Sequence, residues 1–400
     1  MKGRFIVGVL LAGLALSVPV IAGKKSVDCN KGQSLNDAIE KASSGDTISF
    51  NGVCKENIVI QTSGITLAGQ QGAAIQAANP AKEALVIDGA QRVGLQSFTA
   101  EGGSYGIHVE HIGGVIVQNV VVQNNMLTGI FVDGNSSASI SNSSTSGNGV
   151  DGIDAEDSSS LIFTGNFTTQ GNGVFGLNLG ASSSATLNSA TVTASQNVLG
   201  VQISLSSSMF MADPGSTVNA VNNFTTGLTV VSGAHLFVFG GKIVASGNML
   251  MGISLFSRSG LDLDAASQVS SFNNVGDGVH LEELSTVNLF NTPAFSGVPG
   301  VTALQVHNNV GNGISALLNS QVHMFNQTQI QSQNNTGIGL QVDNGSSLTL
   351  LTSTLTGNPS GDVVLTFGSR GEFTKNSITK LSCDATSLIR GDTGKTCPVP

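Results

Sequence analysis

The sequence predicts an all-β solenoid, a coil whose successive turns stack on one another. Three observations predict it: a short phrase recurs along most of the chain, its period is nearly constant, and apolar and polar residues alternate between its copies. The phrase is Asn, three residues, Gly, an aliphatic residue, any residue and usually a second aliphatic, as in Asn148–Ala155. A near-fixed period of this length indicates a repeat architecture.

The glycine of the phrase marks the period. Neighbouring copies are mostly about 23 to 27 residues apart, with one longer step from Gly278 to Gly313. The asparagine four residues earlier is present in most copies, while Gln196 takes its place before Gly200, with Asn197 beside it. We expect these asparagines to stack in a ladder, each amide bonding the coils above and below. The glycines are Gly106, Gly129, Gly152, Gly176, Gly200, Gly227, Gly252, Gly278, Gly313 and Gly339.

Short alternating runs separate the copies. After Gly176, Leu177 and Leu179 alternate with other residues, and a second run extends from Ala185 to Ala194. Alternation of period two, interrupted by Gly, Ser and Asn, predicts strands of four or five residues. Because no useful helical spacing lies between the runs, each strand is expected to pair with its counterpart one repeat later, at about 4.8 Å per coil.

The first 22 residues are typical of a signal peptide. Lys2 and Arg4 precede an apolar run from Phe5 to Ala22 that ends in small and aliphatic residues. A membrane anchor is the alternative, but Pro19 and the small residues favour cleavage. No other stretch is long and apolar enough to span a bilayer. We therefore predict a secreted or periplasmic protein with no stable membrane anchor after cleavage.

Residues 23–75 are predicted to form an N-terminal cap and the first coils. The segment Ser34–Ala42 has the spacing of a short amphipathic helix, with Ser34 placed to cap it and Asp37 three residues on. Strands are expected at 45–50, 58–60 and 64–67. A helix over the first coil would cover the open end of the core. The apolar stripe of this helix is Leu35, Ala38, Ile39 and Ala42.

Four cysteines lie beyond the signal peptide, two near each end. An exported chain permits disulfides, and four cysteines allow three pairings. In a long rod the two pairs would lie at opposite ends, so we predict the bonds Cys29–Cys54 and Cys383–Cys397. Between them, residues 76–368 are predicted to form the repeats, and residues 369–400 a C-terminal cap.

The repeated phrase resembles that of right-handed parallel β-helix proteins, the pectin-lyase-like superfamily. The resemblance covers roughly residues 45–368 and implies a single-stranded right-handed parallel β-helix with an N-terminal capping helix. The superfamily contains lyases, hydrolases, esterases and epimerases of polysaccharides, and also non-catalytic adhesins, so it leaves the reaction open. The sequence lacks the Asn-Thr-Asp, Asp-Asp and Gly-His-Gly set of the polygalacturonases and the Asp-Pro-His-Asp run of the alginate epimerases.

The charge balance limits the partners. The formal net charge is −9, and no Lys or Arg occurs from Val93 to Gly241. Such a chain is not expected to bind nucleic acid, which needs basic residues against phosphates. Neutral polysaccharides or cations are the expected partners.

Candidate functional residues lie two and four positions after the repeat glycine. Aliphatic neighbours point inward, so these side chains should point outward. At the second of these positions, carboxylates on adjacent coils would stack about 4.8 Å apart and repel one another. Three outcomes are possible: a raised pKa that makes one carboxyl a general acid, a bound Ca²⁺, or plain solvation of an exposed acidic face. In the first coils the two positions carry His108, Phe131 and Asp154, and Glu110, Asp133 and Glu156.

Two hypotheses for function follow. In the first, the protein is a non-catalytic binding or structural module of the cell envelope that interacts with glycan. The missing catalytic motifs slightly favour this hypothesis. In the second, it is a secreted carbohydrate-active enzyme, glycosidase-like rather than a lyase. Asp133, Asp154 and Glu156 would then supply the paired carboxylates, and His108 an acid or base.

The same surface offers residues for substrate and metal. Tyr105 and Phe131 could stack on a sugar, with Glu110 beside them. A Ca²⁺ ion could be held by Glu110, Asp133 and Glu156; no other cofactor is expected. A lyase is disfavoured because a uronate would meet only negative charge here, unless Ca²⁺ bridges the two.

A second acidic group precedes the long step in the period. It comprises Asp277, His280, Glu282 and Glu283. The segment 290–301, which follows it, is expected to leave the coil as a loop. Such a loop could wall a groove, or it could be an insertion tolerated on the surface.

Overall fold

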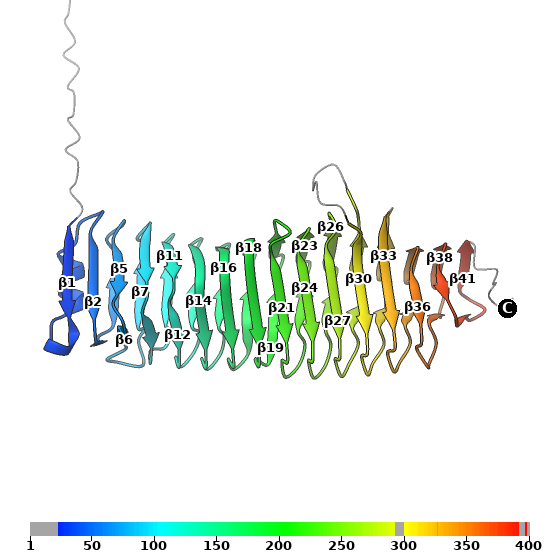
Figure 1. Cartoon of the computed structure of the whole chain (residues 1–400), viewed down its shortest axis with the longest axis horizontal. Helices are drawn as coiled ribbons and strands as arrows, with labels where there is room; N and C mark the ends of the chain where they lie inside the picture. Colours follow the sequence, from blue (N-terminus) through cyan, green and yellow to red (C-terminus); the bar gives the residue numbers. More distant parts are fainter. Residues whose placement is uncertain (1–22, 293–299, 326, 392–396, 398–400) are drawn as a thin grey trace, which may run out of the picture.

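Parallel strands stacked along one axis make up almost all of the regular structure. The computed structural model describes residues 23–292, 300–325, 327–391 and 397. Figure 1 shows a rod whose coils follow the sequence from one end to the other. The predicted signal peptide and residues 293–299 of the predicted loop lie outside the described residues. Within the described ranges, no helix is long and apolar enough to cross a membrane.

Two parallel sheets run the length of the rod. Within the described residues, sheet A has 27 strands and sheet B has 14. Sheet B takes one short strand from each coil, and each strand pairs in parallel with the strand one coil later, as predicted. Its strands are β4 (Ile58–Ile60), β7 (Leu85–Asp88), β10 (Ile107–Glu110), β13 (Ile130–Val132), β15 (Ile153–Ala155), β17 (Phe175–Leu179), β19 (Leu199–Ile203), β22 (Leu228–Val231), β25 (Ile253–Phe256), β28 (Val279–Leu281), β31 (Ile314–Ala316), β34 (Leu340–Val342), β37 (Val363–Leu365) and β40 (Leu381–Cys383).

Sheet A takes two runs from most coils. Examples are β8 (Val93–Gln96) with β9 (Thr99–Glu101), and β11 (Gly114–Gln118) with β12 (Val121–Gln123). In three coils the two runs join into one strand of 10 to 12 residues: β14 (Ser137–Ser146), β16 (Ser160–Gln170) and β18 (Ser184–Ser195).

The expected length of four or five residues is therefore wrong for these three strands. The pairing register shifts between Ser141 and Ser143 and again between Thr164 and Gly165. At the bend Asn142 and Gly165 have φ of 47° and 65°, which asparagine and glycine adopt more readily than other residues. One bulged residue turns the strand without ending it, and such a bend is too short to appear as a loop in the sequence.

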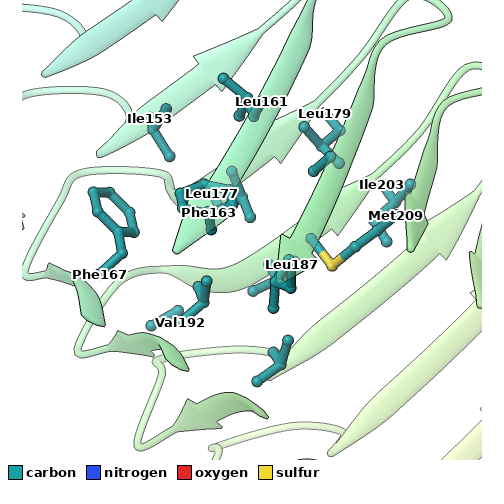
Figure 2. Close-up of a cluster of buried hydrophobic side chains, with 14 of the residues drawn as sticks. Ile153, Leu161, Phe163, Phe167, Leu177, Leu179, Leu187, Val192, Ile203 and Met209 are labelled. Carbon is teal, nitrogen blue, oxygen red and sulfur yellow. The ribbon is translucent and has the colours of Figure 1, made fainter. Parts of the chain in front are cut away.

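The core is a continuous apolar column inside the coils. Figure 2 shows one section of it, where Ile153 and Leu177 from sheet B lie near Leu161 and Phe163 from sheet A. All four are at most 1% exposed. Full burial of an aliphatic or aromatic side chain stabilises a protein by about 1.5–3 kcal/mol, so this column provides the main stabilisation of the rod.

An asparagine ladder runs along one turn of the coils. From Asn125 to Asn335, each side-chain amide donates to the Oδ1 of the ladder asparagine in the next coil, for example from Asn223 to Asn248 at 3.0 Å. Asn197 takes the place that the sequence assigned to Gln196: it donates to Asn223 and is fully buried. That assignment is wrong because the turn before Gly200 is one residue shorter. The ladder comprises Asn125, Asn148, Asn172, Asn197, Asn223, Asn248, Asn274, Asn309, Asn335 and Asn358.

The repeat glycine makes room for this ladder. A Cβ at Gly200 would lie 2.4 Å from the carbonyl oxygen of Gly227 and 2.7 Å from Nδ2 of Asn223. Neither contact is sterically possible unless the backbone of Gly227 and the side chain of Asn223 move. The phrase therefore contains glycine because the next coil approaches too closely for a side chain.

The N-terminal cap forms as predicted. Helix α1 (Leu35–Glu40) has Ser34 as its N-cap, whose hydroxyl accepts from the Asp37 amide at 3.1 Å. The Glu56 carboxylate accepts from the amide of Leu35 at 2.7 Å, which satisfies another free donor of the first turn. Leu35 and Ile39 are buried in the core.

Both predicted disulfides are confirmed. Cys29 pairs with Cys54 and Cys383 with Cys397, with Cα–Cα distances of 5.1 and 5.4 Å. The parallel pairing of sheet A also continues through β38 (Arg370–Thr374) and β41 (Leu388–Gly391), inside the segment predicted as a C-terminal cap.

Removal of the N-terminal disulfide is expected to destabilise the protein by about 3 kcal/mol, because the bond closes a loop with a sequence separation of 25. The test replaces Cys29 and Cys54 by alanine and compares thermal unfolding with that of the unaltered protein. Reduction of the unaltered protein should lower its stability at least as much. An unchanged unfolding temperature in the double variant would show that the cap does not need the bond.

Candidate functional site

The outer face of sheet B carries the candidate site. Strands β10, β13 and β15 pair in register, so His108 lies beside Phe131 and Phe131 beside Asp154. Their inward neighbours, such as Ile107 and Val109, are fully buried in the core, so the three side chains point outward, as the sequence predicts. They are nevertheless well covered: His108 is 9% and Asp154 8% exposed.

Three rings form one end of this site, which we call the aromatic cluster: Tyr105, His108 and Phe131. The Tyr105 and Phe131 rings stack with centroids 5.1 Å apart, and His108 stacks on Phe131 at 5.0 Å. Tyr105 and His108 are 5.3 Å apart and tilted. Because the rings pack on one another, a sugar could stack only on the ring surface that remains free.

Carboxylates surround the imidazole of His108. Its Nε2 lies 3.4 Å from Oδ1 of Asp133 and 3.9 Å from Oε2 of Glu110. Its Nδ1 lies 3.9 Å from Oε1 of Glu83. The structure thus brings together the predicted residues His108, Glu110 and Asp133, and adds Glu83.

Glu83 was missed from the sequence because it precedes the phrase by one coil. Leu85 pairs with Ile107, which places Glu83 beside Tyr105 of the next coil. Two coils beyond Tyr105, the same column of positions carries Asp151. Reading the column immediately before the repeat glycine would have identified it.

Asp154 and Asp151 are the two buried acids of the site. Burial, together with the charges of Asp151 and Glu156, raises the pKa of Asp154 to about 7, against a hydrogen bond from Asn178 that lowers it. That bond runs from Nδ2 of Asn178 to Oδ1 of Asp154 at 2.8 Å. Burial also raises the pKa of Asp151 to about 6, although the backbone amide of Phe175 donates to it.

These pKa values give Asp154 the properties of a general acid. A carboxyl with a pKa near 7 holds a proton in a large fraction of molecules at neutral pH and can still release it. The pKa of the Tyr105 phenol is raised by burial and by the charge of Asp154, so Tyr105 is a hydrogen-bond donor rather than a phenolate. Glu156, on the same strand end as Asp154, is half-buried.

His111 lies apart from this site. Its ring is largely exposed, and Nδ1 bonds to Oδ1 of Asp88 at 2.8 Å. The hydrogen bond to Asp88 raises the pKa of His111, with a further effect from Glu110.

The second acidic group is only partly assembled. His280 Nδ1 bonds to Oδ2 of Asp277 at 2.9 Å, and its Nε2 lies 3.6 Å from Glu282. The Glu283 carboxylate instead accepts from the Ser257 hydroxyl at 2.6 Å. Burial opposes ionisation of Asp277, but hydrogen bonds from His280 and other donors hold its pKa below the usual value.

The donors to Asp277 show what this second group does. Besides His280, the backbone amide of Asn312 and the hydroxyl of Ser315 each donate to it at 2.7 Å. Residues from two consecutive coils thus meet on one carboxylate. Asp277 therefore links the two coils on either side of the long step. Both of its carboxylate oxygens accept hydrogen bonds from the protein.

Comparisons with known proteins identify the architecture. Residues 84–267 match a family model described as a right handed beta helix region. No curated protein matches the sequence. Among solved structures, the A-module of the Azotobacter vinelandii mannuronan C-5 epimerase AlgE6 is 14% identical with a TM-score of 0.50, over 90% of this chain and 94% of that one.

Two other solved structures are more distant. Pectate lyase Pel9A is 13% identical with a TM-score of 0.42, over 68% of this chain and 77% of that one. The Yersinia enterocolitica family 28 exopolygalacturonase is 10% identical with a TM-score of 0.41, over 94% of this chain and 78% of that one. At these identities the likeness concerns the fold. The chain has a right-handed parallel β-helix fold, as its repeated phrase predicts.

Proposed function

We propose that this protein binds a polysaccharide on the outer face of sheet B and hydrolyses it there, with Asp154 as the general acid. The observation that carries the proposal is the buried Asp154 carboxyl, whose pKa of about 7 leaves a large fraction of it protonated at neutral pH, two residues before Glu156. The fold shared with a mannuronan C-5 epimerase supports a polysaccharide as the ligand. Disulfides at both ends of the rod support an exported protein.

In this mechanism two carboxyl groups have different roles, one as the general acid and the other as the general base. Asp154 donates its proton to the glycosidic oxygen as the bond to the anomeric carbon breaks. The Glu156 carboxylate stabilises the positive charge on the sugar and removes a proton from the attacking water. Tyr105, held as a neutral phenol, donates a hydrogen bond to the sugar, and Phe131 contacts its apolar side.

The charge around the site selects the sugar. Glu110, Asp133 and Glu156 are half-buried acids in the stretch from Val93 to Gly241, which has no Lys or Arg. A uronate carboxylate would be repelled by them. A neutral polysaccharide is therefore the preferred substrate.

The proposal is tested by incubating the purified protein with a panel of neutral and acidic polysaccharides. New reducing ends and new unsaturated products are followed separately. We expect new reducing ends from a neutral polymer, lost in Asp154→Asn and Glu156→Gln and retained in Asp157→Asn, which alters an exposed carboxylate on the next residue. Unsaturated products would show that the polymer is cleaved by elimination and not by hydrolysis. No product from any polysaccharide in the panel would contradict turnover.

A second candidate function is glycan binding without turnover. The outward column of sheet B continues past Asp154 with uncharged polar side chains joined from coil to coil. Gln202 donates to Asn178 at 3.3 Å, and the hydroxyls of Thr229 and Ser254 are 2.8 Å apart. Such a track offers hydrogen bonds to an extended sugar chain. Binding of a polymer without any product would favour this function.

A further inference from the structure

One nitrogen of the site has no partner. The Nε2 atom of His108 is buried and lacks a hydrogen bond to any described residue. A buried polar atom without a partner costs about 1–3 kcal/mol, so native proteins rarely keep one without a reason. The rest of the residue is also well covered, since His108 is 9% exposed.

The distances around this nitrogen suit a shared ligand better than direct bonds. Oδ1 of Asp133 lies at 3.4 Å and Oε2 of Glu110 at 3.9 Å, beyond the 2.7–2.9 Å or so of a charged hydrogen bond. Two ligands of a tetrahedral metal ion with bonds of about 2.1 Å are about 3.4 Å apart. One ligand atom from each of these three residues lies within 4.8 Å of the others.

We propose that His108 Nε2, Asp133 and Glu110 form a binding site for a divalent transition-metal ion of the Zn²⁺ type. An imidazole with two carboxylates suits zinc and similar ions, whereas Ca²⁺ takes oxygen ligands. The set therefore differs from the Ca²⁺ site expected at Glu110, Asp133 and Glu156, because the histidine replaces Glu156.

The other side of the imidazole supports this assignment. A metal-bound histidine usually presents its second ring nitrogen to a carboxylate or carbonyl, which fixes the ring and its tautomer. The Nδ1 atom of His108 faces the Glu83 carboxylate, whose Oε1 lies 3.9 Å away and would have to move about 1 Å closer to accept a hydrogen bond from it. Phe131 stacks on the same ring and holds its plane, so Nε2 is directed toward the two carboxylates.

A neighbouring trio is the competing site. Asp88, Glu110 and His111 also place three ligand atoms within 4.8 Å of one another. However, the His111 side chain is 71% exposed and its Nδ1 already bonds to Asp88 at 2.8 Å. It lacks the unpartnered buried nitrogen that favours the His108 site.

The test measures metal binding directly and needs no polysaccharide, so its outcome does not depend on the proposed hydrolysis. The protein, prepared without a polyhistidine tag and stripped with a chelator, is titrated with Zn²⁺ by calorimetry. We expect one ion per chain, with His108→Gln and Asp133→Asn each weakening the affinity at least tenfold. Co²⁺ in place of Zn²⁺ should give a visible absorption band that both variants lose.

His235→Gln is the matched control. The Nδ1 of His235 is also buried without a partner among the described residues, but this histidine stacks on Phe237 in sheet A. Its loss should change the affinity by less than twofold, and circular dichroism should show every variant folded. No Zn²⁺ binding by the unaltered protein, or binding lost in Asp88→Asn and His111→Gln but kept in His108→Gln, would overturn the assignment.

Discussion

At pH 8 the variant Asp154→Asn is expected to be more stable than the unaltered protein by up to about 4 kcal/mol. Burial raises the pKa of Asp154 from 3.8 to about 7, and a difference of this size corresponds to about 4 kcal/mol. Asparagine removes the charge and keeps an oxygen to accept the hydrogen bond from Asn178.

The pH dependence follows from the same pKa. Between pH 4 and 7 the folded state holds a proton on Asp154 that the unfolded state has released, so stability falls as pH rises. The loss begins near the unfolded pKa, is complete above about pH 7, and is absent below about pH 4. Asp151, with a pKa raised to about 6, adds to the same slope.

Denaturant unfolding at pH 5 and pH 8 tests this prediction. The unaltered protein should lose stability between the two, and Asp154→Asn should lose much less. Asp157→Asn, which alters an exposed acid, should behave like the unaltered protein. The same Asp154→Asn variant should lower turnover at least 100-fold, within the range for loss of a general acid. Equal pH dependence in all three proteins would mean that Asp154 is ionised in the folded state.

Asn223→Ala is expected to destabilise the protein by about 3 kcal/mol or more. Its Oδ1 accepts from the backbone amide of Asn197 at 3.2 Å, and its Nδ2 donates to Asn248 and to the carbonyl of Ala194. The side chain is fully buried, so alanine leaves several buried polar groups without partners, at about 1–3 kcal/mol each.

The matched control is Asn219→Ala in the same coil. Asn219 is half-buried and its amide makes one bond, to Thr193 at 3.3 Å. Its loss should change the free energy of unfolding by about 0.5 kcal/mol or less. Similar losses in both variants, measured by denaturant unfolding, would show that the ladder does not stabilise the rod more than any surface amide.

The sequence predicts the fold well because one local rule is repeated. The phrase fixes both the ladder and the glycine that the ladder requires, so the pairing of strands one repeat apart could be predicted without a structure. The choice between Gln196 and Asn197 could not, since both carry an amide and only the length of the turn distinguishes them.

The site could be predicted in position but not in chemistry. Alternation placed His108, Phe131 and Asp154 on the outer face, and the structure keeps them there. Their burial depends on side chains one coil away, such as Tyr105 and Asn178. Whether a carboxyl is exposed to water or buried depends on how neighbouring coils stack, so the sequence of a single repeat does not predict it.

Binding of a polysaccharide to Phe131→Ala tests the central claim, that sheet B carries the glycan site. Affinity electrophoresis would compare this variant with the unaltered protein and with Phe237→Ala, which removes a 38% exposed ring from β23 (His235–Phe239) of sheet A. We expect Phe131→Ala to weaken binding at least tenfold and Phe237→Ala to leave it unchanged. Equal affinity in all three proteins, or loss only in Phe237→Ala, would place the glycan elsewhere and contradict the account.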